Sequence, residues 1–316
     1  MFKRSAQLTV GALFAFAVLA APADPPTWAY GTAPQPKPPA APAPDSSLKQ
    51  LPGSTLSFTR AQISDRFSPA DWFPTDHPPM PQVVAKGRKP EIWACGLCHY
   101  PNGKGRPENA GVSGLPVEYF IGQMKKFQTG TRSSADLGKK NTNIMIAIAK
   151  AMTDDEIKQA AEYFGAMPWT PWIKVVETTT VPKTYTNVGM YLPLEGNEKE
   201  PIGHRIIETP VDPEGTEVLR NPRSGFIAYA PIGSVKKGER LVAKQSCEVC
   251  HGSDLKGLGP VPGIAGRSPS YLVRQLYDIQ QGTRHGSWTE LMKPAVANLS
   301  EDDMLNIAAF TSSRTP

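Results

Sequence analysis

The sequence is poor in charge of either sign, in cysteine and in long apolar runs. Charged residues make up only 20% of the 316 residues, and the net charge of +5 is not gathered into a basic stripe, so nucleic-acid binding has no support. Beyond the N-terminus no run reaches the roughly 18 apolar residues that a spanning helix needs, which excludes a multi-span membrane protein. With 40% hydrophobic residues the chain can still bury real cores, and its four cysteines carry the functional argument.

The N-terminus has the pattern of a secretory signal. Lys3 and Arg4 precede an apolar stretch over 8–20, and Ala21-Pro22-Ala23 supplies the small residues that a signal peptidase requires. We therefore expect residues 1–23 to be a signal peptide and the mature protein to be exported to the periplasm. A retained membrane anchor is the alternative, but the apolar core is short and the cleavage site follows directly.

Composition divides the remaining chain into four parts. Residues 24–78 begin with a Pro- and Ala-rich stretch, which predicts a flexible segment because such a composition buries little surface. Residues 79–167 and 232–316 have helical patterns, whereas 168–231 alternate short β-rich runs with Gly and Pro turns. The predicted fold is mainly α: two tandem helical domains joined by an irregular, partly β connector. Helices are expected at 119–127, 154–164, 238–245, 270–280 and 300–312, and strands at 173–176 and 204–208.

The two helical parts are copies of one repeat. Cys95-Gly-Leu-Cys98-His99 returns 152 residues later, from 95 to 247, as Cys247-Glu-Val-Cys250-His251. After five extra residues in the first copy the spacing falls to 147, and Met145 then matches Met292. Each methionine stands eight residues before Thr153 or Ser300, which predict the N-caps of two final helices. The other matched residues are Tyr119 and Tyr271, Gln123 and Gln275, Gln128 and Gln280, and the Gly-Thr-Arg runs ending at Arg132 and Arg284.

The duplicated Cys-x-x-Cys-His motif is the signature of c-type haem attachment. Two cysteines at this spacing lie about one helical turn apart, so both reach the vinyl groups on one haem edge, and the histidine faces the iron. A zinc site would need the two pairs a short loop apart, but Cys98 and Cys247 are 149 positions apart. A dithiol redox site would need a βαβ context that is missing. The motif therefore predicts two covalently bound haem c groups.

The sixth ligand of each iron decides between electron transfer and catalysis. Met145 and Met292 occupy equivalent places in the repeat, which favours them as axial ligands over core packing. Met152 is the near rival, but its counterpart in the repeat, Leu299, cannot bind iron. Met124 likewise corresponds to a leucine, Leu276. The histidines without a counterpart, expected in loops or at the surface, are His77, His204 and His285.

The repeated motifs resemble the class I c-type cytochromes, and more closely the di-haem cytochrome c4 group. The resemblance covers both copies and rests on Cys-x-x-Cys-His, a Gly-rich loop, a Tyr-x-x-x-Gln helix, the Gly-Thr-Arg turn and the methionine before the capped helix. It implies two tandem class I cytochrome c domains. It further implies His99 and His251 as proximal ligands and Met145 and Met292 as distal ligands. Arg132 and Arg284 would then neighbour the haem propionates.

The resemblance also carries two structural expectations. In the family a proline carbonyl orients the proximal histidine; Pro260 or Pro262 suits this in the second copy, whereas the first copy has Glu108 and Ala110 at those places, with Pro107 displaced. Close helix packing at Gly238 against Phe310 is expected in the second copy. The first copy has Lys86 in place of that glycine, and Pro90 interrupts its N-terminal helix, so it should be less regular.

The sequence thus predicts an exported di-haem cytochrome that carries single electrons between redox partner proteins. No catalytic residue, nucleic-acid partner or membrane span after signal removal is expected. Two alternatives stay open: a di-haem peroxidase-like enzyme with one open haem, and the cytochrome subunit of a periplasmic dehydrogenase complex.

Overall fold

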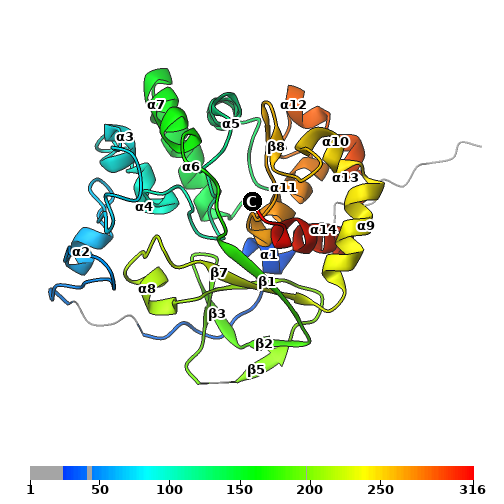
Figure 1. The fold of residues 1–316 in the computed structure, drawn as a ribbon, viewed down its shortest axis with the longest axis horizontal. Coiled ribbons are helices and arrows are strands. Elements are labelled where there is room, and N and C mark those ends of the chain that lie inside the picture. Colours follow the sequence, from blue (N-terminus) through cyan, green and yellow to red (C-terminus); the bar gives the residue numbers. More distant parts are fainter. Residues whose placement is uncertain (1–23, 41–44, 197) are drawn as a thin grey trace, which may run out of the picture.

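The two copies of the repeat lie side by side, and a layer of short strands lies below them (Figure 1). The computed structural model describes residues 24–40, 45–196 and 198–316, so the expected signal peptide at 1–23 lies outside the described residues. The helices of the first copy are α3 (Gln82–Ala85), α4 (Cys95–His99), α5 (Val117–Thr129), α6 (Lys140–Ala151) and α7 (Asp154–Gly165). Those of the second are α9 (Ser234–Lys244), α10 (Cys247–His251), α11 (Pro269–Gln280), α12 (Ser287–Glu290), α13 (Lys293–Val296) and α14 (Glu301–Ser313), with a small ribbon of β8 (Gly257–Leu258) and β9 (Val261–Pro262).

All five predicted helices are present, and the predicted N-caps are confirmed. The hydroxyl of Thr153 accepts the N–H of Glu156, whose carboxylate accepts the Thr153 N–H in return. Ser300 and Asp303 form the same reciprocal pair at the start of α14. Each pair satisfies backbone donors that a helix start would otherwise leave free.

The N-terminal and C-terminal helices of the second copy cross closely, as predicted. A Cβ built on Gly238 of α9 would lie 1.9 Å from the Asn306 carbonyl oxygen and 2.7 Å from the Cβ of Phe310 in α14. Only glycine permits this approach. The corresponding helix of the first copy, α3, has four residues where α9 has eleven, which confirms that the first copy is less regular.

Residues between the copies form small sheets. β7 (Phe226–Pro231) is central in a three-stranded sheet, parallel to β1 (Ile173–Thr178) and antiparallel to β6 (Ile207–Pro210). Predicted strand 173–176 is confirmed, whereas the strand expected at 204–208 begins later, at Ile207. Two antiparallel pairs complete this part: β2 (Thr180–Pro182) with β5 (Lys199–Pro201), and β3 (Thr184–Asn187) with β4 (Met190–Pro193).

The expectation that residues 24–78 are a flexible segment is wrong for most of the described part. Trp28 and Tyr30, in α1 (Thr27–Tyr30), are buried in the core of the second copy. The indole of Trp28 donates to the Glu301 carboxylate over 2.9 Å, and the Tyr30 hydroxyl donates to Asp278 over 2.6 Å. The prolines favour an extended chain, but two buried aromatic rings supply enough apolar surface to fix it.

A later part of this segment, from Leu51 to Phe73, packs beside the first copy, where the Ala94 N–H donates to the Arg66 carbonyl over 2.8 Å. Leu51, Ile63, Trp72 and Phe73 form a buried cluster of their own around α2 (Arg60–Ile63), and the Trp72 indole donates to the Leu219 carbonyl over 2.6 Å, just after α8 (Pro213–Glu217). Within the described ranges no helix is both long and apolar enough to cross a membrane.

Candidate cofactor site

Each attachment motif forms a one-turn helix, α4 or α10, which places its two cysteines on one side. The four cysteines form no disulfide, so all are free to form thioethers. Among the residues that the structure describes, no cluster of three or more His, Cys, Asp or Glu side chains could hold a metal ion. All four thiols are therefore available for the predicted haem attachment.

The two motif histidines are oriented identically. Nδ1 of His99 lies 2.8 Å from the Ala110 carbonyl oxygen, and Nδ1 of His251 lies 2.8 Å from that of Pro262. Since a carbonyl only accepts, Nδ1 carries the proton and Nε2 keeps its lone pair. Burial lowers the pKa of both rings below the ordinary value, which favours the neutral form that binds metals.

These bonds answer the question left by the missing proline. Pro262 is the residue that orients His251, and Ala110, which matches it in the repeat, does the same for His99 without being proline. The displaced Pro107 takes another role: its carbonyl accepts Arg274 Nη2 over 2.6 Å.

A cavity in the first copy lies beside His99. It encloses about 840 Å³ of space between the atoms, a figure that includes the open solvent at its mouth. Met145, on α6, lines the cavity together with His99. The apolar side chains on its walls include Val112, Leu115, Phe120, Met124 and Phe127.

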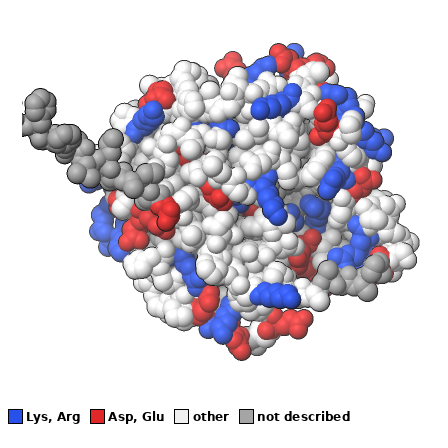
Figure 2. All heavy atoms as spheres, turned by 180° about the vertical axis from the view of Figure 1, so that it is seen from behind, with Lys and Arg blue, Asp and Glu red and all other residues white. Residues whose placement is uncertain are grey.

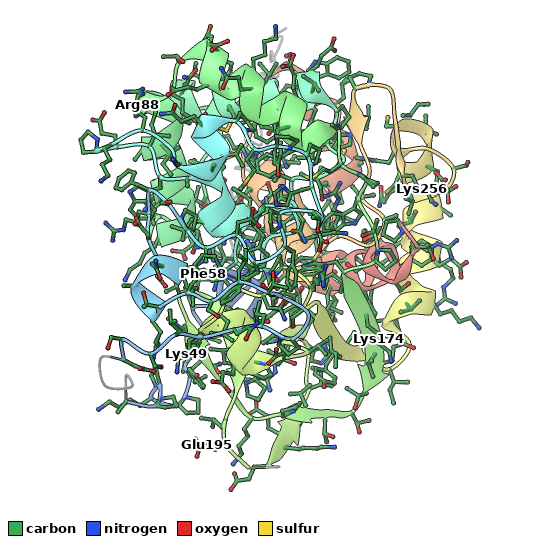
Figure 3. The ribbon with its side chains drawn as sticks, turned by 60° about the vertical axis from the view of Figure 1, so that its left-hand side comes forward. Lys49, Phe58, Arg88, Lys174, Glu195 and Lys256 are labelled. Carbon is green, nitrogen blue, oxygen red and sulfur yellow. The ribbon has the colours of Figure 1, made fainter. Side chains whose placement is uncertain are left out.

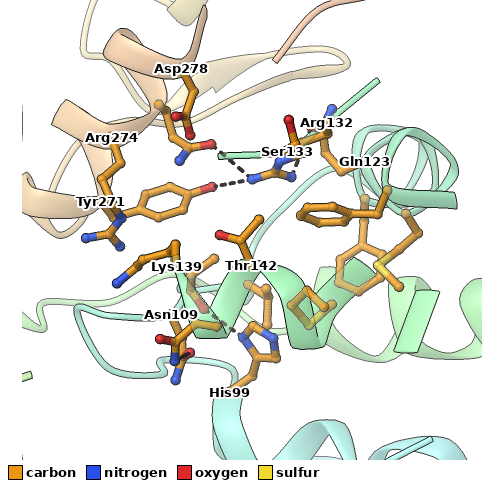
Figure 4. A pocket seen from close by; sticks show the side chains of 18 of the residues that line it. His99, Asn109, Gln123, Arg132, Ser133, Lys139, Thr142, Tyr271, Arg274 and Asp278 are labelled. Atoms are coloured by element: carbon orange, nitrogen blue, oxygen red, sulfur yellow. Dashed lines mark hydrogen bonds between the residues drawn. The ribbon is translucent and has the colours of Figure 1, made fainter. Parts of the chain in front are cut away.

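The other end of this cavity is basic (Figure 4). Three basic side chains, Arg132, Lys139 and Arg274, line it together with two acidic ones, Glu108 and Asp278, so basic groups outnumber acidic ones there. Lys139 and Arg274 are both buried, and each donates to the end of α1: Lys139 Nζ to the Tyr30 carbonyl over 3.3 Å, Arg274 Nη1 to the Ala29 carbonyl over 2.7 Å. Burial and the neighbouring Arg274 lower the pKa of Lys139 to about 7.

This donor set fits a haem. A porphyrin is apolar across its ring and carries two anionic propionates on one edge, and the cavity is apolar on one side and cationic on the other. Buried cations are costly unless an anion compensates them, and propionates would supply that charge. His99 in α4 and Met145 in α6 both line the cavity and would hold the iron.

The segments that follow the two methionines are held in the same way. Gln128, at the end of α5, donates to the carbonyls of Ala149 and Met152 over 2.9 and 3.2 Å. Gln280, at the end of α11, donates to those of Val296 and Leu299 over 2.8 Å each. Ala149 and Val296 are 147 positions apart, and so are Met152 and Leu299. This is the spacing between the two copies that the sequence indicates for the part after Arg132.

Arg132 and Arg284 meet between the two copies. Their backbones form an antiparallel bridge, and each side chain donates to both copies. Arg132 binds Gln123 of its own copy over 3.0 Å and Tyr271 and Gln275 of the other over 3.2 and 3.0 Å. Arg284 mirrors this, binding Gln275 over 3.0 Å, Tyr119 over 2.8 Å and Gln123 over 3.1 Å. The repeated Tyr, Gln and Arg therefore join the copies with approximate twofold symmetry.

Sequence reasoning missed Lys139 and Arg274. Neither is repeated: Lys139 lies among the extra residues of the first copy, and Arg274 matches Gly122.

Of the rival methionines, Met152 is buried in the core, while Met124 lines the cavity from α5. His204 is exposed as expected, and His285 binds the Gly282 carbonyl. His77 lies in a loop but has a buried side chain that contacts Asp71 and Tyr163.

Comparison with known proteins agrees with this geometry. The family model for cytochrome c matches residues 235–314. Cytochrome c-554(548) of Halomonas halodenitrificans is 36% identical over 83 residues, which are 26% of this chain and 98% of that protein. Cytochrome c4 of Thiocapsa roseopersicina is 35% identical over 96 residues, 29% of this chain and 47% of that protein. The thiosulfate dehydrogenase electron acceptor of Stutzerimonas stutzeri is 26% identical over 228 residues, 71% of this chain and 80% of that protein.

The chain therefore belongs to the class I c-type cytochromes. With two attachment motifs and relatives in the cytochrome c4 group, it is a di-haem cytochrome that carries electrons and holds two covalently bound haem c groups.

Proposed function

We propose that the four motif cysteines form the thioethers and that each iron has a histidine and a methionine as axial ligands. His99 and Met145 serve the first copy, and His251 and Met292 the second. Met145 and Met124 both line the cavity beside His99, but Met145 matches Met292 in the repeat whereas Met124 matches Leu276, and this pairing inside the cavity carries the proposal. The matched bonds of Gln128 and Gln280 support the same assignment for Met292, which is partly buried against the core of the second copy.

We further propose that Arg132, Lys139 and Arg274 compensate the propionates in the first cavity, and that Arg284 contributes from the second copy. Arg132 and Arg284 lie beside each other between the copies, and two neighbouring guanidinium groups favour an anion near them. The same arrangement supports two tandem cytochrome c domains that contact each other through this network.

With both irons six-coordinate, the chain would take up and release single electrons without binding substrate, so we propose a carrier rather than an enzyme. The signal pattern expected at 1–23 and the covalent haem attachment both support export to the periplasm. The charges do not single out a partner: Figure 2 shows basic and acidic side chains interspersed over one whole face.

A second candidate is the cytochrome subunit of a periplasmic dehydrogenase. It is favoured by the relative named as a thiosulfate dehydrogenase electron acceptor, which aligns with 71% of this chain and so extends beyond either repeat. In that case the electron donor would be a dehydrogenase that this chain binds. Purification of the native complex under mild conditions would separate this candidate from a free carrier.

The ligand assignment is tested by absorption spectra and carbon monoxide binding. The ferric wild-type protein should show the long-wavelength band of methionine-ligated haem, and its ferrous form should bind no carbon monoxide. Met145→Ala and Met292→Ala should each open one iron to carbon monoxide and raise peroxidase activity, whereas Met152→Ala should only loosen the core. A wild-type protein that already binds carbon monoxide and turns over peroxide, with neither property changed in Met145→Ala or Met292→Ala, would establish the enzyme instead.

A further inference from the structure

The two attachment helices differ sharply in exposure. Leu97 in α4 and Val249 in α10 occupy the same place in the repeat, yet Leu97 is 4% exposed and Val249 is 74% exposed. The flanking cysteines follow the same trend, since Cys98 is partly buried and Cys250 is exposed. The chain therefore covers one attachment face and leaves the other open.

The cover is built from two segments, which we call the cap: residues 45–78 and residues 213–225. Arg220 of the cap donates to the Leu97 carbonyl over 2.8 Å. The Ala94 N–H, just before α4, donates to the Arg66 carbonyl of the cap over 2.8 Å. Asn102, just after α4, donates to the Pro222 carbonyl over 2.6 Å. The cap thus holds α4 before, within and after the motif.

The two cap segments also hold each other. In addition to the bond from Trp72 to Leu219, Arg223 forms two bonds to Asp76 over 2.7 and 2.8 Å, and its guanidinium lies 3.6 Å from the centre of the Phe73 ring. The cap has its own buried cluster, so it is a fixed part of the fold. In Figure 1 α2 and α8 lie near α4, and α10 lies on the far side. Phe58 of the cap and Lys256, which follows α10, are well apart in Figure 3.

The open face has the chemistry of a transient contact surface. Leu258 in β8, which packs against α10, is 61% exposed, so two large apolar side chains face solvent on touching elements. Along the segment from 244 to 258, which holds α10 and β8, the exposed charges are Lys244, Glu248, Asp254 and Lys256, two of each sign. Such a surface suits a partner with an apolar contact face and little net charge, and it predicts weak dependence on ionic strength.

We propose that the cap closes the first copy to other proteins, so that a small redox protein with an apolar contact face exchanges electrons with this chain at α10 of the second copy. Electrons then reach the first haem through the second. The proposal rests on the carrier function above and adds where the partner binds. Encounters of this kind bury little surface, commonly less than about 1,200 Å² in total, so single side chains can control them.

The test compares two exposed valines that lie on different faces. Val249→Glu places a carboxylate on the open face, and Val211→Glu makes the same change next to the cap, where Val211 is 62% exposed. The reduced full-length holoprotein is mixed with an excess of oxidised azurin, a small copper protein, and the bimolecular rate is followed at the haem bands. Burying an unpaired carboxylate in the contact should slow Val249→Glu at least tenfold and leave Val211→Glu within twofold of wild type.

Equal rates for both variants, a larger effect of Val211→Glu, or no transfer from the wild-type chain would overturn the proposal. Nuclear magnetic resonance gives an independent measurement: azurin should shift amide signals of 247–258 and leave those of 95–99 unchanged, and the reverse pattern would also refute it. Wild-type dimers that Val249→Glu dissociates would mean that a second copy covers this face, which contradicts the proposal too. Failure of the carrier function itself is distinguishable, because it would show as carbon monoxide binding by the wild-type protein.

Discussion

The Tyr30 hydroxyl offers a sharp test of whether the N-terminal segment belongs to the fold. It donates to Asp278 Oδ1 over 2.6 Å in a fully buried position. Tyr30→Phe removes this donor and keeps the ring, which packs edge-on against Tyr277 with centroids 6.2 Å apart. The change therefore isolates one bond between the segment and α11.

The stability lost in Tyr30→Phe depends on which hydrogen bonds Asp278 keeps. A hydrogen bond to a charged group contributes about 1.5–3 kcal/mol, and a buried acceptor left short of a donor costs its desolvation. Asp278 keeps the Ala135 N–H at 2.8 Å, so the loss should lie at the lower end, about 1.5–2 kcal/mol. For a chain of this size, roughly 2 °C of melting temperature corresponds to each kcal/mol, which gives a decrease of about 4 °C.

Tyr185→Phe is the matched control. Its hydroxyl lies 3.4 Å from Glu217, which keeps a shorter bond of 2.7 Å to Asn187, so the change should cost less than about 0.5 kcal/mol. Thermal and denaturant unfolding of the holoprotein, followed by circular dichroism, would measure both variants. If Tyr30→Phe melts with the wild type, or if a chain that lacks residues 24–33 does, then the segment does not stabilise the protein and the argument is refuted.

The deficit of Tyr30→Phe should also depend on pH. Burial raises the pKa of Asp278 above 3.8, while the bond from Tyr30 opposes this shift. A raised folded pKa means that the stability from this group is fully present below the unfolded value and is lost as the pH rises through the folded value. Without the Tyr30 hydroxyl the pKa of Asp278 in the folded protein rises further. The stability lost in Tyr30→Phe relative to the wild type should therefore be largest at pH 7 and shrink toward pH 4. A deficit that grows on acidification would contradict the assigned bond.

Three further predictions concern packing, potential and haem content. Gly238→Ala should destabilise the protein by about 3 kcal/mol, because the new Cβ would overlap the Asn306 carbonyl. Gly122→Ala, where no atom lies within 4 Å of the new Cβ, should stabilise α5 by up to about 1 kcal/mol. Denaturant midpoints that move in the same direction in both variants would contradict this prediction. Lys139→Met should lower the potential of one haem by tens of millivolts, at about 40 mV per kcal/mol of lost charge stabilisation, and exposed Lys140→Met should leave both potentials unchanged in a redox titration. Denatured protein should retain two haems per chain and show no free thiol in a thiol assay; one haem would be inconsistent with the repeat.

Local signals in the sequence were sufficient for the repeated parts of the fold. A serine or threonine followed by acids predicts a capped helix start, and Thr153 and Ser300 are such caps. Gly238 predicts close packing because no other residue lacks a Cβ, and α9 and α14 do cross there. Repetition added a second observation of each motif, which is why the change of spacing after Arg132 could be predicted. The carbonyl that orients the histidine was predicted only in the second copy, where Pro262 supplies it, because Ala110 supplies it in the first copy without being proline.

Features outside the repeat could not be predicted this way. Composition averages over a segment, so the prolines of residues 24–40 outweighed Trp28 and Tyr30, although two aromatic rings decide where that segment packs. Lys139 and Arg274 carry no local signal, because a buried cation is recognised only by the groups around it. Arg274 reaches the carbonyls of Ala29 and Pro107, 245 and 167 positions away, and no sequence pattern connects them.

The non-repeated segments explain how two similar domains come to differ. Both copies keep the motif, the oriented histidine and the glutamine that holds the segment after the methionine, so their attachment chemistry is the same. What differs is the surroundings: α1 brings two carbonyls to Lys139 and Arg274 beside the first cavity, and the cap covers α4. A charge near a haem shifts its reduction potential, and a segment that covers a haem limits which partner proteins can approach it. Potential and access can therefore change in one copy through segments that leave the repeat itself intact, and the Lys139→Met and Val249→Glu measurements separate these two effects.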